Sequence, residues 1–294
     1  MSRLGNYIAL VFLWLFSLQP FFILYRYSDI LYHIIRLIGY RRSVINENLR
    51  YAYPDKSDED IREMRLKFYR GFCDIIIETI KFQTMSERQL RKRFTFKNIE
   101  YVNTVAEAGK DVVAVMGHYA CWEWMSSINL HARMQCCATY RPLKNKIFDK
   151  HMLKVRSRWG SLNFTMQSTM RELVKLRQND QRFLIGLLAD QSPDKNKIQY
   201  WTKFLNQNTA VLLGPEKMAK AFKAVVVFLR VSRIKRGYYE VNVIPLTEDA
   251  AATSDYEITE KHLQCLENII MERPEDWLWS HKRWKYSETR EITT

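Results

Sequence analysis

From residue 98 onward, the chain alternates between short apolar runs and longer segments in which apolar residues recur every three to four positions. The short runs, which we predict to be strands, cover residues 112–116, 135–140, 162–166, 183–188, 225–231 and 239–244. The longer segments, which we predict to be helices, cover residues 122–133, 145–159, 169–178 and 215–222. This alternation predicts an α/β fold whose mainly parallel central sheet is flanked by helices. The last two runs, joined around "KRGYY", predict an antiparallel hairpin instead.

The chain begins with an uncharged run from Leu4 to Tyr25. This run predicts contact with a membrane, because about 20 residues of apolar helix cross a hydrocarbon core of about 30 Å. Gln19 and Pro20 interrupt it, so both a spanning helix and a helix lying in the membrane interface are open. A buried helix of a soluble protein is the third alternative. Arginines after the run outnumber the one before it, which places the main body on the cytoplasmic face.

The residues between this run and the α/β body are helical in pattern. Residues 57–82 begin with Ser57 and Asp60 in capping-box spacing and continue with helical periodicity. Ser86 starts a further helix in the same way. We therefore divide the chain into an N-terminal hydrophobic helix (1–40) and a main domain (41–294). The main domain comprises a helical preface (41–97) and the α/β body (98–294).

The charge balance favours anionic partners. The chain has 46 Lys and Arg against 32 Asp and Glu, a formal net charge of +14. Such a surplus is typical of proteins that bind nucleic acid, an anionic membrane, or an acidic substrate or protein. The P-loop, G-x-G-x-x-G and G-x-S-x-G motifs are absent, which removes the usual nucleotide-binding and nucleophile-elbow fingerprints. The five cysteines include no C-x-x-C pair, so neither a zinc site nor a disulfide framework is indicated.

The candidate site is "GHYACWEWM", directly behind the predicted strand 112–116. If Gly117 permits a sharp turn, His118 stands at the carboxyl end of a strand, where open α/β sheets bind ligands. On one continuous helix, His118 and Glu123 would point about 140° apart. The two side chains therefore meet only if His118 precedes a helix and Glu123 lies in its first turns.

Two uses of this pair are open on the motif alone. As a catalytic dyad, neutral His118 would remove a proton from a substrate hydroxyl, while Glu123 accepts the other imidazole N–H. That chemistry suits acyl transfer to an alcohol without a covalent enzyme intermediate. In the structural alternative, both side chains satisfy a helix N-terminus. A metal site is disfavoured, because the spacing differs from H-E-x-x-H and a third spaced ligand is missing.

Two further segments carry candidate functional residues. Asp190 and Gln191 follow the apolar run 183–188, so we expect them near His118 and assign them to substrate binding, although a turn and helix cap is an equal alternative. Over residues 277–285, three tryptophans lie among basic residues. This tail could pack on the body, lie at the level of membrane headgroups or bind single-stranded nucleic acid. We expect no nucleic acid partner, since no nucleic-acid-binding fold is recognisable.

Five ordered segments resemble the late acyltransferases of lipid A biosynthesis, the lauroyl/myristoyl family. They are "GHYACWEW", "TYRPLKN", "LLADQSP", "GPEKMAKAF" and "PEDWLWSHKRWK". The likeness extends from the N-terminal run and "NLRYAYP" to Lys285. One departure is "YWTKFLNQNTAVLLGPEK", where Asn206 and Val211 replace positions that are often glycine or proline in the family. The shape of that loop, and with it the choice of lipid, is therefore not implied.

The resemblance implies an enzyme of the glycerolipid acyltransferase superfamily, with a catalytic pair at His118 and Glu123 and no cofactor. The implied partners are a membrane, acyl carrier protein as acyl donor, and a phosphorylated glucosamine lipid as acceptor. The implied location is the cytoplasmic face of the inner membrane. A guanidinium group binds phosphate with two parallel hydrogen bonds, so we assign Arg141, with Asn145 as a companion, to substrate binding.

Two alternatives to this function stay open. The same chemistry would serve a lysophospholipid, aminolipid or glycolipid acyltransferase. A non-enzymatic membrane-associated or nucleic-acid-binding protein could retain the fold without the reaction.

Overall fold

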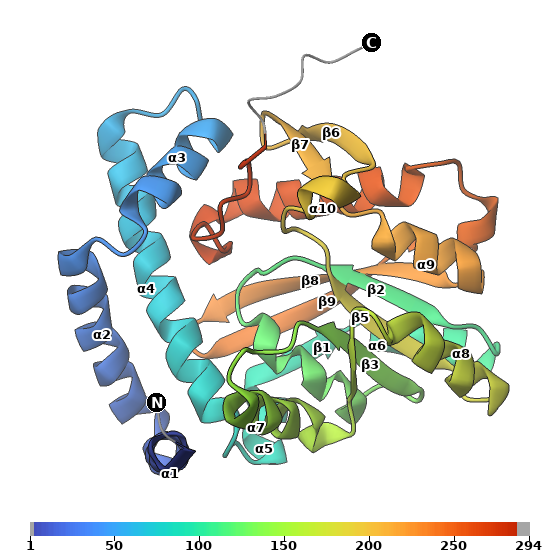
Figure 1. Ribbon diagram of the computed structural model, residues 1–294, viewed down its shortest axis with the longest axis horizontal. Coiled ribbons are helices and arrows are strands. Elements are labelled where there is room, and N and C mark those ends of the chain that lie inside the picture. The colour runs from blue at the N-terminus through green and yellow to red at the C-terminus, as the bar shows by residue number, and fades with distance from the viewer. Residues whose placement is uncertain (1–2, 287–294) are drawn as a thin grey trace.

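The computed structural model describes residues 3–286 and has a seven-stranded sheet at its centre (Figure 1). The strand order is β1-β9-β8-β2-β5-β3-β4. The strands span β1 Phe94–Lys97, β2 Val112–Met116, β3 Gln135–Tyr140, β4 Leu162–Thr165, β5 Phe183–Leu188, β8 Val225–Lys235 and β9 Tyr238–Thr247. All neighbours are parallel except β8 and β9, which form an antiparallel hairpin. The α/β fold, the mainly parallel sheet and the hairpin predicted from the sequence are thus confirmed.

Helices cover both faces of this sheet. Helices α9 and α10 lie above it in Figure 1, and α7 and α8 lie below it. The helices of the body span α6 Ile99–Glu107, α7 Lys146–Arg156, α8 Thr169–Gln178, α9 Gly214–Phe222 and α10 Glu257–Glu272. The short strands β6 Tyr200–Phe204 and β7 Gln207–Val211 pair with each other outside the main sheet. Strands β1, β6 and β7 were not predicted, because none of them is a continuous apolar run.

The predicted helix over 122–133 is a 3₁₀ helix, η1, from Trp122 to Leu130. Its sequence, "WEWMSSINL", contains Ser127 and Asn129, whose side chains donate to the carbonyl groups of Trp124 and Ser126. Such side-chain bonds compete with regular helix hydrogen bonding. Glu123 lies in the first turn of η1 and His118 precedes it, as the spacing of the two residues required.

Five helices precede β1: α1 Arg3–Leu18, α2 Phe21–Ile38, α3 Arg42–Ala52, α4 Asp58–Phe82 and α5 Glu87–Arg93. The uncharged run is divided between α1 and α2, because Pro20 takes an extended backbone conformation and caps α2. Among residues 3–286, the structure contains no helix that combines the length and the apolar character needed to cross a bilayer. The predicted capping boxes at Ser57 and Ser86 are both formed.

Helix α4 joins the N-terminal helices to the sheet through buried polar groups. Glu78 is fully buried and accepts hydrogen bonds from the hydroxyl groups of Tyr25 on α2 and Tyr239 on β9. The Lys81 ammonium donates to the carbonyl groups of Ser17 and Gln19, where α1 ends. Because a buried polar group is costly unless it is paired, these bonds fix α1 and α2 against α4.

The C-terminal segment packs on the body, which settles the alternatives for its tryptophans. Trp277, Trp279 and Trp284 are at most 5% exposed. Helix α3 holds the segment, because Asn48 donates to the carbonyl groups of Trp279 and His281. This packing brings Trp277 to the edge of the sheet at which β2 and β5 end.

Candidate active site

The candidate site lies at the carboxyl ends of β2 and β5, which are neighbours in the sheet. Met116 and Leu188 are in register, and the backbone N–H of Ala189 continues the pairing to the carbonyl of Met116. Gly117 and His118 follow β2, and Asp190 follows Ala189 at the end of β5. The prediction that Asp190 lies close to His118 is therefore confirmed.

Asp190 holds the imidazole of His118. Its Oδ1 lies 2.6 Å from His118 Nδ1, and its Oδ2 accepts the backbone N–H of His118 at 2.8 Å. The indole N–H of Trp277 also donates to Oδ2, at 2.8 Å. Both carboxylate oxygens thus have partners, and the residue is only 3% exposed. These contacts fix the imidazole with its proton on Nδ1 and its lone pair on Nε2.

The two residues shift each other's pKa in the directions that favour an ion pair. Burial alone would raise the pKa of Asp190, but the imidazole and the three hydrogen bonds lower it to about 2. Burial alone would lower the pKa of His118, but the charge and hydrogen bond of Asp190, and the more distant charge of Glu123, raise it. Asp190 is therefore ionised at neutral pH and stabilises the imidazolium form of His118.

Gly117 provides room for this pair. A Cβ atom at residue 117 would lie 2.7 Å from Cδ1 of Leu266 and 3.2 Å from Oδ2 of Asp190. The backbone of Gly117 is not left-handed; the left-handed residue of this turn is Ala120, with φ of 50°. The turn expected at Gly117 is present, because the backbone N–H of Tyr119 donates to the carbonyl of Gly117 at 2.8 Å. Gly117 also serves close packing.

Glu123 has a different partner from the one expected. Arg156 of α7 donates from Nη2 to Oε1 at 2.7 Å and from Nε to Oε2 at 3.1 Å. The expectation that Glu123 accepts the second imidazole N–H is corrected, because Asp190 occupies that position on His118. The paired guanidinium instead orients the Glu123 carboxylate through two hydrogen bonds.

Two other reactive side chains near His118 are unsuited to catalysis. Cys121 is fully buried, and burial together with Glu78 raises the pKa of its thiol well above the ordinary value. His281 uses its Nε2 lone pair to accept the backbone N–H of Ser192, and burial beside Arg283 lowers its pKa to about 4. Neither a thiolate nucleophile nor a second histidine base is available at this point of the site.

The remaining sequence candidates lie at the same edge of the sheet or just beyond it. The side-chain nitrogen of Gln191 is 3.4 Å from His118 Nε2. Arg141 directly follows β3, the neighbour of β5, and is exposed. Asn145 caps α7 by accepting the N–H groups of Ile147 and Phe148. Asn145 thus has a clear structural role, whereas Arg141 is free to meet a ligand.

Sequence reasoning missed Arg156, Trp277 and the contact of Asp190 with the imidazole. The order of the strands could have indicated Asp190, since its segment was already expected near His118. Arg156 was one of seven basic residues between positions 141 and 158, with nothing to single it out. Trp277 comes 87 residues after Asp190, and only the packed C-terminal segment brings them together.

Metal ligation has no evident location in the part of the chain that is described. No group of three or more His, Cys, Asp or Glu side chains has an arrangement that could hold an ion there. The polar groups around His118 are instead engaged with one another.

Comparison with known proteins gives one consistent family. The sequence profile described as "Bacterial lipid A biosynthesis acyltransferase" matches residues 1–286. The chain is 23% identical over 268 residues to the lipid A biosynthesis palmitoleoyltransferase of Escherichia coli (strain K12), which covers 83% of this chain and 79% of that protein. It is 21% identical over 278 residues to the lipid A biosynthesis lauroyltransferase of the same strain, covering 93% and 89%. The similarity includes the whole candidate site.

Proposed function

The chain belongs to the bacterial lipid A biosynthesis acyltransferase family, and from that premise we propose that it moves a fatty acyl chain from acyl carrier protein to a hydroxyl of a lipid A precursor, with His118 as general base. Family membership, which the ordered motifs had predicted, supports acyl transfer in lipid A biosynthesis. The observation that carries the mechanism is the hydrogen bond between His118 Nδ1 and the buried carboxylate of Asp190.

The reaction requires one proton acceptor beside the acceptor hydroxyl. His118 Nε2 takes the hydroxyl proton while the oxygen attacks the thioester carbonyl carbon of the donor. The tetrahedral intermediate then collapses, its C–S bond breaks, and the imidazolium returns the proton to the departing thiolate. Asp190 stabilises the positive charge that His118 carries between these steps, which is when the interaction is strongest.

We assign Asp190 to positioning and no longer to substrate binding, since its oxygens are engaged by His118 and Trp277. Glu123 keeps a catalytic role in this proposal, as a fixed negative charge near the imidazolium and beside the substrate. Arg156 positions that carboxylate. Gln191 is placed to contact the group that approaches His118 Nε2.

Arg141 and Asn145 are proposed to lie along the path of the acidic substrates. Arg141 is exposed at the carboxyl edge of the sheet, where its guanidinium can bind a phosphate through two hydrogen bonds. The basic residues that follow on α7 favour approach of an acidic carrier protein by long-range attraction.

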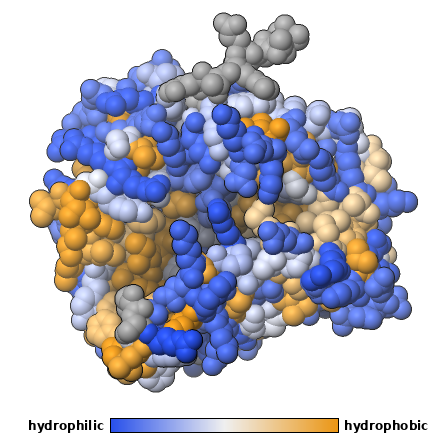
Figure 2. Space-filling model, viewed as in Figure 1, coloured by the Kyte–Doolittle hydropathy of each residue, from blue (hydrophilic) through white to orange (hydrophobic). Residues whose placement is uncertain are grey.

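Membrane contact is proposed through the outer faces of α1 and α2. Large apolar side chains are exposed along both helices, among them Leu4 and Phe12 on α1 and Phe22 and Leu37 on α2. Figure 2 shows them as an apolar margin over these helices, beside a hollow in the same face. Such a face suits a helix pair lying in the interface of the inner membrane, with the body on the cytoplasmic side.

Lipid analysis of a strain from which the gene is deleted tests the function. We expect lipid A from that strain to lack one acyl chain, and the chain to return when the gene is restored. If lipid A is unchanged and a phospholipid, aminolipid or glycolipid lacks an acyl chain instead, that other lipid is the acceptor.

A further inference from the structure

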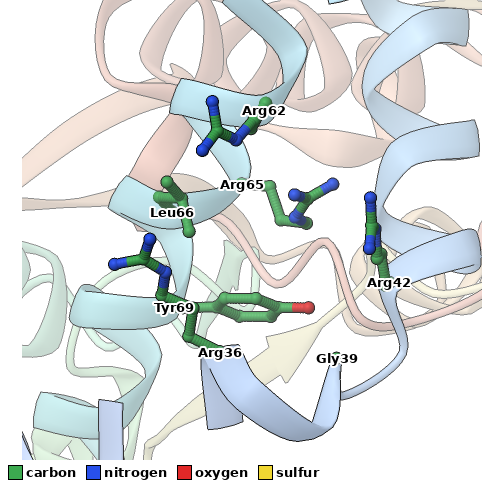
Figure 3. A pocket seen from close by; sticks show the side chains of 7 residues that line it. All are labelled: Arg36, Gly39, Arg42, Arg62, Arg65, Leu66 and Tyr69. Atoms are coloured by element: carbon green, nitrogen blue, oxygen red, sulfur yellow. The ribbon is translucent and has the colours of Figure 1, made fainter. Parts of the chain in front are cut away.

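A basic pocket lies on the N-terminal helices, apart from the candidate active site at His118. Four arginines, Gly39, Leu66 and Tyr69 line a pocket of about 290 Å³ between α2, α3 and α4 (Figure 3). The arginines are Arg36, Arg42, Arg62 and Arg65. Figure 3 shows the guanidinium groups of Arg42 and Arg65 facing each other.

Most of the charges in this pocket have no carboxylate partner among the residues that the structure describes. Of the four arginines, Arg62 is paired with Glu59, an exposed contact on the same helix. Within residues 3–286, the ion pairs include none with Arg36, Arg42 or Arg65. Burial, together with the nearby guanidinium groups of Arg42 and Arg62, lowers the pKa of Arg65. Gathered like charges repel one another, so an anion in the pocket would remove an unfavourable interaction.

The position of Arg65 suits the binding of an anion and does not serve solubility alone. It is 6% exposed, and Nη1 donates to the Oδ1 of Asn46 at 2.5 Å, which fixes the guanidinium plane. Helix α3 begins at Arg42 with no side-chain cap, so its N-terminus adds partial positive charge beside the pocket. Rigid guanidinium groups match the geometry of phosphate better than that of a diffuse negative surface.

The surroundings indicate where the phosphate comes from. Three apolar residues near Arg36 on α2 are exposed: Ile34, Leu37 and Ile38 are 50%, 87% and 67% exposed. They continue the apolar face of α1 and α2 that Figure 2 shows. A basic pocket at the end of an apolar helix face has the arrangement that binds lipid headgroups, with acyl chains against the apolar side chains.

We propose that the pocket lined by Arg36, Arg42, Arg62 and Arg65 binds the phosphate of an anionic membrane lipid and thereby orients the protein on the bilayer. This inference rests on the proposed membrane contact of α1 and α2. It adds a specific lipid site that is separate from the one at His118.

Vesicle binding with matched variants tests the proposal. The pocket variant is Arg36→Gln/Arg42→Gln, two exposed residues whose replacement leaves the core intact. The control variant is Arg26→Gln/Lys56→Gln, which removes the same charge from exposed positions outside the pocket. Co-sedimentation is measured with phosphatidylcholine vesicles that contain either phosphatidylglycerol or, at equal surface charge, oleic acid.

For phosphatidylglycerol vesicles, we expect the pocket variant to bind at least about tenfold more weakly than the control variant. For oleate vesicles, we expect the two variants to bind alike. Arg65→Lys, which keeps the charge but loses the planar fork, should show the same selective loss. Acyl transfer in detergent should be unchanged in all three, which separates this proposal from that for His118.

Four results would overturn the inference. Equal loss in the pocket and control variants would mean diffuse attraction, and absence of wild-type binding to any vesicle would remove the membrane contact itself. Full competition by millimolar inorganic phosphate, without a preference for vesicles, would assign the pocket to free phosphate. A raised KM for acyl carrier protein with vesicle binding intact would assign it to the carrier.

Discussion

Replacing Asp190 with asparagine should distinguish the contribution of Asp190 to catalysis from that of Glu123, the other carboxylate that could assist His118. The change keeps the size of the side chain but removes its charge and one of its acceptor oxygens. Asp190 accepts from His118 Nδ1, the backbone N–H of His118 and Trp277 Nε1, so asparagine cannot satisfy all three donors. The imidazole then loses both its fixed tautomer and the partner for its developing charge.

The expected loss of activity follows from the strength of the hydrogen bond between Asp190 and the imidazole. A hydrogen bond to a charged group contributes about 3 kcal/mol at its upper end, and the bond to Asp190 is strongest when His118 is an imidazolium. We therefore expect kcat to fall by about a hundredfold or more, because about 1.4 kcal/mol corresponds to a factor of ten. The assay is the initial rate of ester formation with acyl carrier protein as donor, followed by mass spectrometry.

Stability must be measured alongside the rate. The pKa of Asp190 is about 2 in the folded protein against an ordinary value of 3.8. The corresponding stabilisation, about 2 kcal/mol, is present above the ordinary pKa and lost as the pH falls through the folded one. The variant should thus melt lower but remain folded at assay temperature. Trp277→Phe, which removes one donor and keeps the ring packing, is the milder companion.

One pattern of rates would refute this reasoning. If Asp190→Asn retained activity within about threefold of wild type while Glu123→Gln abolished it, Glu123 would be the partner of the imidazole during catalysis. The hydrogen bond from Asp190 would then describe a resting arrangement only.

Three further predictions concern the same site. The activity of the wild-type enzyme should rise with pH, with a midpoint above 6.5, because His118 must be neutral to act as a base and Asp190 raises its pKa. In Asp190→Asn this rise in activity should occur at lower pH, and an unshifted pH–rate profile would contradict the prediction. Glu123→Gln should lower kcat by about tenfold and shift the pH dependence to lower pH by less than Asp190→Asn does, since the charge of Glu123 raises the pKa of His118 less than Asp190 does. A double variant that also carries Arg156→Gln, measured in the same assay, should cost little more if the pair acts as a unit. Gly117→Ala should lower stability by about 1–3 kcal/mol in thermal unfolding and reduce activity, because the added methyl group meets Leu266 and Asp190, and an unchanged melting temperature would argue against this packing.

Local patterns were sufficient to predict the sheet where strands are short, apolar and bounded by polar residues. Strands β2, β3 and β5 and helix α8 begin and end where the sequence indicated. Strand β1 was not predicted because apolar and polar side chains alternate in its four residues, and because it pairs in parallel with a strand far along the chain. The uncharged run predicted one N-terminal helix, but Pro20 divides it between α1 and α2.

The site shows the same division between local and long-range information. Its position followed from topology, since neighbouring parallel strands end at one edge. Which carboxylate meets His118 depends on two long-range contacts, Trp277 with Asp190 and Arg156 with Glu123. The spacing of His118 and Glu123 carries no information about either of these contacts.

The most direct test of the central claim is acyl transfer by purified protein carrying His118→Ala. Wild-type protein, given acyl carrier protein loaded with a fatty acid and a phosphorylated glucosamine lipid precursor, should form a new ester on the lipid. The variant should remain folded, as judged by circular dichroism, and should form the ester at least about a hundredfold more slowly. A folded His118→Ala variant that transfers the acyl chain at the wild-type rate would contradict the account.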